Sequence, residues 1–348
     1  MNKKVTIKQV AAAAGVSPAT VSYVLNKKRT ISEETKRRVW GAINALDYVP
    51  DLSARSLTAG SSKLIGVVVP QTEEGNRLMF ENNFYSEILG SIELCARKRG
   101  YHVLISASDS NETYLTLAKE RNLDGIIAIG MYPNSFYQEM KKSQKPIVLV
   151  DSYCNDHYYH SVSVDDAYGS YLATKYMIEH GHREIAFFCG EIRENGVTKQ
   201  RLKGYREAME ETGLAFSPDY VFEGKIDYEN GIGLANRLCD SGLKATAVVA
   251  SADILAISAM KAFYERGIRV PDDISVIGFD DLQVSKYLTP GLTTVHQDIS
   301  GKGERAMELL FNSMEDPTLT KREEIMPVEI VERGSVKALN VPTERQVR

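Results

Sequence analysis

The chain has 348 residues, 43% of them hydrophobic and 25% charged, which is typical of a globular protein with two or three domains. No apolar run approaches the roughly 18 residues that a membrane span needs, and the N-terminus lacks the apolar core of a signal peptide. Four scattered cysteines indicate a reduced compartment and no disulfide framework. We therefore expect a cytoplasmic bacterial protein that neither spans a membrane nor is secreted.

Charge is divided unevenly along the chain. Residues 1–60 hold 10 Lys and Arg against 4 Asp and Glu, whereas the other 288 residues hold 32 against 42. The first part is therefore basic and the remainder acidic. A basic head on an acidic body is typical of a protein whose head contacts nucleic-acid phosphates and whose body does not.

Residues 6–26 indicate two short helices joined by a tight turn. Apolar residues recur at helical spacing, Thr6 stands at an N-cap position, Gly15 supplies the turn, and Ser17 with Pro18 begins the second helix. This shape carries a helix into the major groove of DNA, although an ordinary surface hairpin of helices has the same pattern. In a DNA-binding head, the residues facing the base edges would be Pro18, Ala19, Ser22 and Tyr23.

A third helix follows. Ser32 is its expected cap, Glu33 and Glu34 suit the positive end of its dipole, and an apolar stripe faces inward at Val39, Ala42, Ile43 and Leu46. Three such helices can bury one small core. The basic run before this helix fits phosphate contacts or a solvated loop, and consists of Lys27, Lys28 and Arg29.

Residues 50–60, PDLSARSLTAG, form a linker too short to be a stable helix alone. It carries Leu52, Ala54 and Leu57 among polar residues. An exposed leucine in a linker is usually incidental. Beside a DNA-binding head, Leu57 also fits a wedge that enters a base step from the minor groove, in a segment that becomes helical on binding.

From about residue 63, short apolar runs alternate with helical patterns. Continuous apolar strands between helices favour parallel sheets covered on both faces, and the length suggests two doubly wound lobes. The break between lobes is expected near residues 161–165. The predicted strands are 64–69, 101–106, 125–129, 147–150, 185–189, 247–250 and 274–279.

Polar residues follow several of these strands. Ligands of doubly wound sheets bind beyond the C-terminal strand ends, here in the cleft between the lobes. Asp151, Asp253 and Asp280 stand at such ends, and Arg201 lies nearby in KQRLKGY. Carboxylates that accept paired hydroxyls, with a guanidinium that donates, suit a sugar or a nucleoside. The alternative for each aspartate is a helix cap.

Several strings in order resemble the lactose/galactose repressor family over about residues 5–338. They include VSPATVSYVLN, SEETKRRVWGAINALDYVP, ARSL, IGVVVP, LDGIIAIG, RLKGYREAME, RVPDDISVIGFDD and LTPGLTTVHQD. The resemblance implies a helix-turn-helix head over 1–49, a hinge over 50–62, a periplasmic-binding-protein-like body over 63–338 and a tail over 339–348. It also implies three crossings between the lobes, with lobe one over 63–162 and 293–326 and lobe two over 163–292 and 327–338.

The resemblance assigns roles to single residues. Leu57 corresponds to the hinge leucine that opens the central operator step, and Arg201 and Asp280 correspond to effector contacts. Ile226 and Ala252 depart from the family's aromatic and asparagine, so the stacking surface is expected at Phe84 and Tyr85, or at Tyr132 or Tyr153. The expected DNA-binding residues are Thr6, Ser17, Pro18, Ala19, Thr20, Ser22, Tyr23, Asn26, Arg29, Ala54 and Leu57. The expected effector-binding residues are Phe84, Tyr85, Asp151, Arg201, Asp253, Asp280 and Gln297.

These features predict a ligand-responsive transcriptional regulator that binds a palindromic operator as a homodimer. We expect a repressor of a carbohydrate uptake or utilisation operon, with a sugar or sugar derivative as effector. One alternative is a catabolite-control-type regulator whose signal is a partner protein docked on the first lobe. Another is a free sugar-binding receptor or an enzyme.

Two further motifs are weaker. Cys154, His157 and His160 have a spacing that could hold zinc with a fourth ligand. The string GKGERA at 301–306 mimics a dinucleotide fingerprint but reads better as the start of a packed helix. We expect no catalytic residue, metal or cofactor, and no enzymatic activity.

Overall fold

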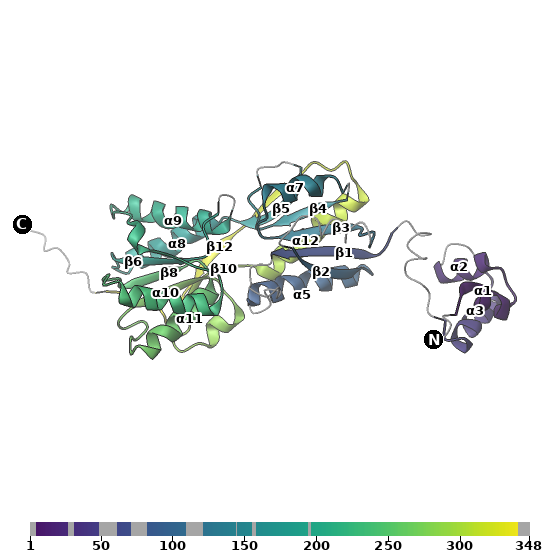
Figure 1. Ribbon diagram of the computed structural model, residues 1–348, viewed down its shortest axis with the longest axis horizontal. Helices are drawn as coiled ribbons and strands as arrows, with labels where there is room; N and C mark the ends of the chain where they lie inside the picture. Colours follow the sequence, from purple (N-terminus) through teal and green to yellow (C-terminus); the bar gives the residue numbers. More distant parts are fainter. Residues whose placement is uncertain are drawn as a thin grey trace, which may run out of the picture. The chain divides into compact units, whose positions relative to one another are not determined.

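The computed structural model describes residues 5–26, 31–48, 61–70, 82–108, 121–143, 145–154, 158–193 and 196–339 (Figure 1). They divide into two units, a small helical head and a larger α/β body. None of the helices within these ranges is long and apolar enough to cross a membrane.

The head consists of α1 (Ile7–Ala14), α2 (Pro18–Asn26) and α3 (Glu33–Ala45). Their ends follow the predicted caps. Thr6 and the Gln9 side chain form a capping box, and Gly15 ends α1 with a φ of 64°, which glycine adopts without strain. The Ser32 hydroxyl accepts a hydrogen bond from the Thr35 backbone N–H. The three predicted helices are therefore confirmed.

One small core holds the head together. It gathers the inward faces of all three helices, as their apolar spacing predicted, and consists of Val10, Ala11, Ala14, Val21, Val24, Val39, Ala42 and Ile43. Because this core occupies the inner face of α2, the opposite face of that helix lies at the surface.

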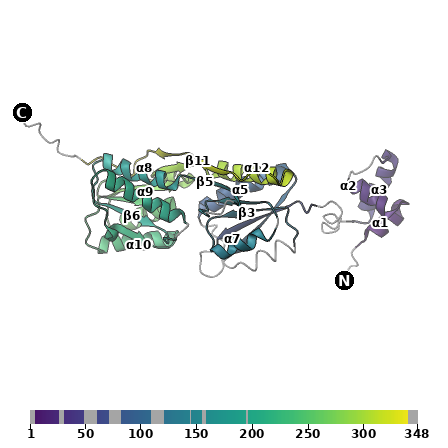
Figure 2. The same cartoon turned by 90° about the horizontal axis from the view of Figure 1, so that it is seen from above.

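The body contains two six-stranded sheets. The first has the order β11-β5-β4-β3-β1-β2. Helices α5 (Asn83–Lys98) and α12 (Ile299–Glu315) lie side by side on one face, and α7 (Asn134–Lys141) lies on the other (Figure 2). We call this sheet with its helices the first lobe. Its strands are β1 (Leu64–Pro70), β2 (His102–Ser108), β3 (Gly125–Ile129), β4 (Ile147–Val150), β5 (His160–Val164) and β11 (Glu323–Met326).

The second sheet has the order β12-β10-β9-β8-β6-β7. Helices α8 (Asp166–Glu179) and α9 (Val197–Glu211) cover one face, and α10 (Tyr228–Asp240) and α11 (Asp253–Glu265) cover the other (Figure 1). This is the second lobe. Its strands are β6 (Ile185–Cys189), β7 (Val221–Glu223), β8 (Ala247–Ala250), β9 (Ser275–Asp280), β10 (Thr293–Gln297) and β12 (Val328–Val331). Two short 3-10 helices, Pro218–Tyr220 and Gln283–Tyr287, complete it.

Most strands that the sequence predicted are apolar and buried, and the exception is β2, a partly exposed edge strand. β3, β4, β6 and β8 have the predicted bounds, and three others shift by one or two residues. The strands that escaped prediction carry polar residues or lie at sheet edges. β5 contains His160 and two serines, β10 begins with two threonines, and β11 is an edge strand with two glutamates.

The chain passes between the sheets three times, from β5 to α8, from β10 to α12 and from β11 to β12. One expected boundary needs correction. β10 pairs with β9 and β12 in the second sheet, so the return to the first lobe begins at α12 and not at residue 293. β5 continues the first sheet to Val164, within the expected break at residues 161–165. Gln297 and Ile299 thus stand on either side of a crossing.

A glycine sets the distance between α8 and α9. A Cβ on Gly204 would lie 1.8 Å from the Ala167 carbonyl oxygen, which belongs to the backbone of α8. Gly233, inside α10, has open space where its Cβ would stand. We expect Gly204→Ala to lower the free energy of unfolding by about 1–3 kcal/mol or more through overpacking. Gly233→Ala should raise it by about 0.5–1 kcal/mol through helix propensity. Urea unfolding measures both, and equal effects would contradict this packing.

Candidate functional site

The body contains a cavity of about 320 Å³ between the strand ends of its two lobes. Six of the seven residues expected to bind an effector line it, namely Phe84, Tyr85, Asp151, Arg201, Asp280 and Gln297. The sequence did not single out other lining residues as contacts, among them Asn82, Met131, Glu191, Arg193, Thr198 and Lys225. The volume lies at the lower end of the range for small-molecule sites.

The two aspartates that line the cavity stand at strand ends in unusual backbone conformations. Asp151 directly follows β4 and has a φ of 52°, and Asp280 ends β9 with a φ of 124°. A non-glycine residue at positive φ costs about 1–3 kcal/mol, and such residues cluster at functional sites. The surrounding structure therefore holds both carboxylates in place against a local cost.

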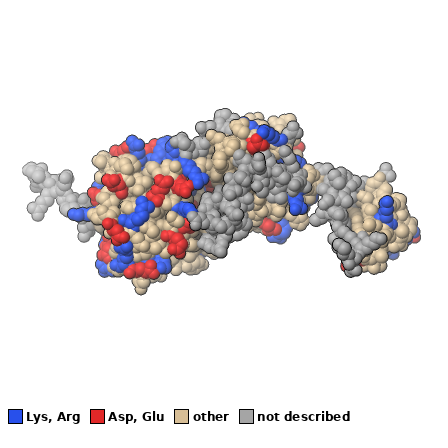
Figure 3. Space-filling view, viewed as in Figure 1, with Lys and Arg blue, Asp and Glu red and all other residues tan. Residues whose placement is uncertain are grey.

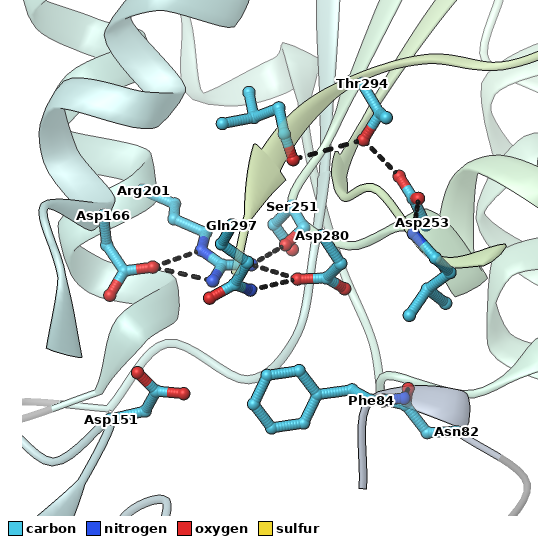
Figure 4. A network of polar contacts seen from close by, with 12 residues as sticks. Asn82, Phe84, Asp151, Asp166, Arg201, Ser251, Asp253, Asp280, Thr294 and Gln297 are labelled. Carbon is cyan, nitrogen blue, oxygen red and sulfur yellow. Dashed lines mark hydrogen bonds and ion pairs between the residues drawn. The ribbon is translucent and has the colours of Figure 1, made fainter. Parts of the chain in front are cut away.

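Arg201 lies between two aspartates (Figure 4). Its Nε and Nη2 each lie 2.7 Å from Asp166 Oδ1, its Nη1 donates to the Ser251 carbonyl, and Asp280 Oδ1 lies 3.7 Å from Nη1. Burial would lower the pKa of Arg201, but Asp166 and Asp280 raise it above its usual value. The guanidinium also lies over the Phe279 ring at 3.6 Å. Most of its donors are thus used within the protein.

The sequence missed Asp166, because an aspartate in the first turn of a helix looks like an ordinary dipole partner. The structure instead places it, fully buried, as the main counter-ion of Arg201. The Tyr153 hydroxyl also donates to Asp166 at 2.6 Å.

Asp280 differs from Asp151 in that one of its carboxylate oxygens has no donor among the described residues. Its Oδ1 accepts from Gln297 Nε2 at 2.6 Å, and among the described residues no donor reaches Oδ2. Burial raises the pKa of Asp280 to about 6, although Arg201 and Gln297 oppose this. A ligand that donates to Oδ2 would stabilise the ionised form.

The first-lobe wall of the cavity is aromatic. Phe84 and Tyr85 pack edge to face with ring centroids 5.3 Å apart. Within the described residues, the Tyr85 hydroxyl has no hydrogen-bond partner, and burial, Asp151 and Asp280 raise its pKa. Tyr132 and Tyr153 lie outside the lining, since their hydroxyls donate to Ile129 O and Asp166. Of the two expected stacking surfaces, only the one at Phe84 and Tyr85 faces the cavity.

The structure corrects the role that the sequence predicted for Asp253. It was expected to contact effector or to cap a helix, but it is fully buried outside the cavity lining. Its oxygens accept from the Leu282 N–H at 2.9 Å and from the Ser285 and Thr294 hydroxyls at 2.6 Å each. Figure 4 shows it beside Thr294. Because these donors occupy the carboxyl group, Asp253 ties α11 to β10 and the loop after β9 instead of facing a ligand.

The head places most expected DNA-reading residues at its surface. Ser17, Pro18 and Ala19 are exposed, and Ser22 and Tyr23 are partly exposed. The Ser17 hydroxyl accepts from the Thr20 N–H at 3.1 Å, so Ser17 also caps the helix. Thr6 is exposed at the start of α1. The Asn26 side chain and the whole of Arg29, Ala54 and Leu57 lie outside the described residues.

Figure 3 shows one face of the body with its charged side chains coloured. There, acidic and basic side chains are interspersed over the second lobe.

His160 is a buried residue of β5 whose Nδ1 accepts from the Arg322 N–H at 3.1 Å, while His157 lies outside the described residues. Across the described ranges, no cluster of three or more His, Cys, Asp or Glu could hold a metal ion.

Asp253 makes the stability of the body depend on pH. Burial raises its pKa from 3.8 to about 8, so its contribution to stability is complete below about pH 4 and is lost as the pH rises to about 8. We expect the wild type to melt at a lower temperature at pH 9 than at pH 6. Asp253→Asn, which mimics the protonated carboxyl, should flatten this dependence. Asp273→Asn is the control, because Asp273 is exposed with a pKa of about 2 and stays charged in this range. An equal loss in Asp253→Asn would contradict the account.

Comparisons with known proteins agree with the two-part organisation. Residues 6–51 match the bacterial regulatory proteins of the lacI family, and residues 174–336 match the periplasmic binding protein-like domain. The chain is 34% identical over 341 residues to the HTH-type transcriptional repressor PurR of Vibrio campbellii, covering 96% of this chain and 99% of that protein.

Solved structures extend the similarity to the fold. The lac repressor dimer bound to operator and the anti-inducer ONPF has a TM-score of 0.83 at 26% identity, covering 97% of this chain and 100% of that chain. The complex of the transcriptional regulator CelR with cellobiose has a TM-score of 0.72 at 27% identity, covering 95% and 99%. The chain therefore belongs to the lacI family of bacterial regulatory proteins and is a ligand-responsive transcriptional repressor of that family.

Proposed function

We propose that this repressor binds a near-palindromic operator as a homodimer, and that a sugar or sugar derivative in the cavity of the body changes its DNA affinity. The regulated genes would serve carbohydrate uptake or utilisation. One observation carries the proposal: the same chain has a helix with its outer face at the surface and a cavity in which some polar atoms, such as Asp280 Oδ2, have no partner among the described residues. The first feature reads DNA and the second binds the signal.

The operator is expected to be palindromic because each head carries a single recognition helix. Two heads related by a two-fold axis meet two half-sites about one helical turn apart. In α2, Pro18 and Ala19 offer only apolar contacts such as thymine methyl groups, whereas Tyr23 adds a hydroxyl. Sequence preference should therefore depend strongly on Tyr23. The lac repressor structure, a dimer bound to operator, supports this arrangement.

The effector is expected to be a neutral, hydrogen-bonding molecule. The groups of the cavity that have no partner among the described residues include Asp280 Oδ2 and the hydroxyls of Tyr85 and Thr198. Arg201 is already held by Asp166 and Ser251, so the Asp280 end has little free positive charge for a phosphate. A carboxylate oxygen with hydroxyls suits vicinal hydroxyl donors. The cellobiose complex of CelR supports a sugar, and a nucleoside stacked on Phe84 is the competing class.

Ligand control follows from where the cavity lies. Phe84, Tyr85 and Asp151 belong to the first lobe, and Arg201 and Asp280 belong to the second. A ligand that contacts both lobes stabilises one of their relative orientations, and this shift is linked to DNA binding by the head. A partner protein on the first lobe stays an alternative source of the signal.

The test is selection of DNA from a random pool by the purified chain. Heat stability of the protein is measured in parallel with sugars, sugar phosphates, nucleosides and nucleobases. We expect a palindrome and one stabilising neutral sugar that changes affinity for it. A palindrome with no response to any compound would favour the partner protein. Failure to select any sequence, with or without the stabilising compounds, would contradict the proposal.

Tyr23→Ala tests DNA reading. Removing the ring should cost about 1–3 kcal/mol of discrimination at the base pairs it contacts, while non-specific affinity stays nearly unchanged. Repeating the selection with the variant and measuring both affinities checks this. The control is Tyr264→Ala, a tyrosine of the body that is 83% exposed. A uniform loss on all sequences would make Tyr23 a phosphate contact.

Tyr85→Phe tests the effector site. The change removes a hydroxyl that faces the cavity and has no partner among the described residues, so the protein should keep its melting temperature. Affinity for the stabilising compound, measured by calorimetry, should fall roughly fivefold to tenfold, as for loss of one hydrogen bond. Tyr132→Phe is the matched control outside the cavity. Unchanged affinity in Tyr85→Phe would show that this hydroxyl does not contact the ligand.

A further inference from the structure

A lysine that the sequence analysis left in a packed helix lies outside the cavity lining but contacts two of its residues, Asp151 and Gln297. Lys302 is the fourth residue of α12, within the string GKGERA, and it is fully buried. Its Nζ lies 2.6 and 2.9 Å from the two carboxylate oxygens of Asp151 and 2.6 Å from Gln297 Oε1. An ammonium group has three donors, and these three acceptors can use all of them.

The acceptors belong to different lobes. Asp151 follows β4 in the first sheet, and Gln297 ends β10 in the second. Gln297 also contacts a second carboxylate, because its Nε2 donates to Asp280 Oδ1 at 2.6 Å. Asp280 in turn lies 3.7 Å from Arg201, which binds Asp166. Six buried side chains therefore form one chain of polar contacts, in the order Asp151, Lys302, Gln297, Asp280, Arg201 and Asp166.

This chain of contacts includes both aspartates that line the cavity. Lys302 contacts both oxygens of Asp151, and Gln297 contacts one oxygen of Asp280. Lys302 also lies over the Phe84 ring, 5.5 Å from its centre. An effector that donates hydrogen bonds to Asp151 or to Oδ1 of Asp280 must compete with these internal donors.

A simpler reading is that Lys302 only neutralises Asp151. Both residues belong to the first lobe, and a buried carboxylate does need a counter-ion. That role leaves the bond to Gln297 unexplained. The bond spans the crossing from β10 to α12, where the two lobes are joined by a single residue, Asp298.

We propose that Lys302 is a positioning residue that couples the effector site to the relative orientation of the lobes. Without ligand, it ties Asp151 to Gln297 and so to Asp280 across the crossing. Effector hydroxyls that bind Asp151 and Asp280 take over these carboxylates, which weakens the tie and lets the lobes reorient. This inference rests on the proposed function of the cavity.

Two variants separate the contact between Lys302 and Gln297, which we call the tie, from the ion pair between Lys302 and Asp151. Gln297→Met removes the contact across the lobes, together with the bond from Gln297 to Asp280, and keeps the Lys302–Asp151 pair. The double variant Lys302→Met with Asp151→Asn removes both contacts without leaving a buried charge unpaired, which protects folding. Lys261→Met is the control, because Lys261 pairs with Glu265 on the surface of α11.

The readout is affinity for labelled, selected operator DNA without any effector, with non-specific DNA of equal length alongside. We expect both variants to shift operator affinity by about fivefold or more in one common direction, while non-specific affinity stays within about twofold. A merely structural loss would not change the ratio of the two affinities in the folded fraction. An unchanged operator affinity in Gln297→Met would overturn the proposal, whatever the double variant does.

Calorimetry of the same proteins makes the test independent of DNA. Loss of the tie should lower the ratio of van 't Hoff to calorimetric enthalpy in both variants, because the lobes then unfold less cooperatively. If the wild type selects no operator, the proposed function fails, and this ratio still tests the tie. An unchanged ratio in Gln297→Met would show that Lys302 acts within the first lobe alone.

Discussion

The shortage of positive charge in the buried cleft is the constraint on which the site depends. Asp151, Asp166 and Asp280 are buried together, and within the described parts of the chain Arg201 and Lys302 are the buried cations that pair with them. Burying an unpaired carboxylate is strongly unfavourable, so each cation must contact more than one partner. Arg201 and Lys302 do this, and Gln297 links them through Asp280. Asp280, one of whose carboxylate oxygens has no donor among the described residues, is also the one best placed to bind a ligand.

The fold creates this constraint through its topology. In parallel sheets the polar residues that follow strands gather at one edge, and here the strand ends of both lobes meet at the cavity. The crossings bring the start of α12 in the first lobe next to the end of β10 in the second. A single buried network of polar contacts therefore includes residues of both lobes, which a site within one lobe could not do.

The sequence predicted the parts of the fold that depend on local patterns. Apolar runs such as 125–129 gave strands with correct bounds, and Thr6, Gly15 and Ser32 gave helix ends, because these signals are read within a few residues. β5 and β10 were not predicted, because the hydrogen-bond partners of their polar side chains lie far away in the sequence. In β10 the Thr294 hydroxyl donates to Asp253, 41 residues away in sequence.

The residue pattern alone predicted site residues only where they stand at the ends of predicted strands. Asp151 and Asp280 stand directly at such ends, and resemblance to the family added Arg201 and Gln297. Asp253 stands at a strand end too, but the donors that occupy it come from segments whose position the sequence does not reveal. Lys302 and Asp166 looked like ordinary helix residues, since only tertiary structure shows that their charges are buried.

The central claim is that ligand binding in the cleft and DNA binding by the head are linked. The most direct test measures the affinity of the full chain for its selected operator, with and without the compound that stabilises the body against heat. The account predicts a change of about fivefold or more, and the Tyr85→Phe variant should need roughly fivefold to tenfold more of the compound to reach the same change. An operator affinity that stays the same at saturating ligand would contradict the account.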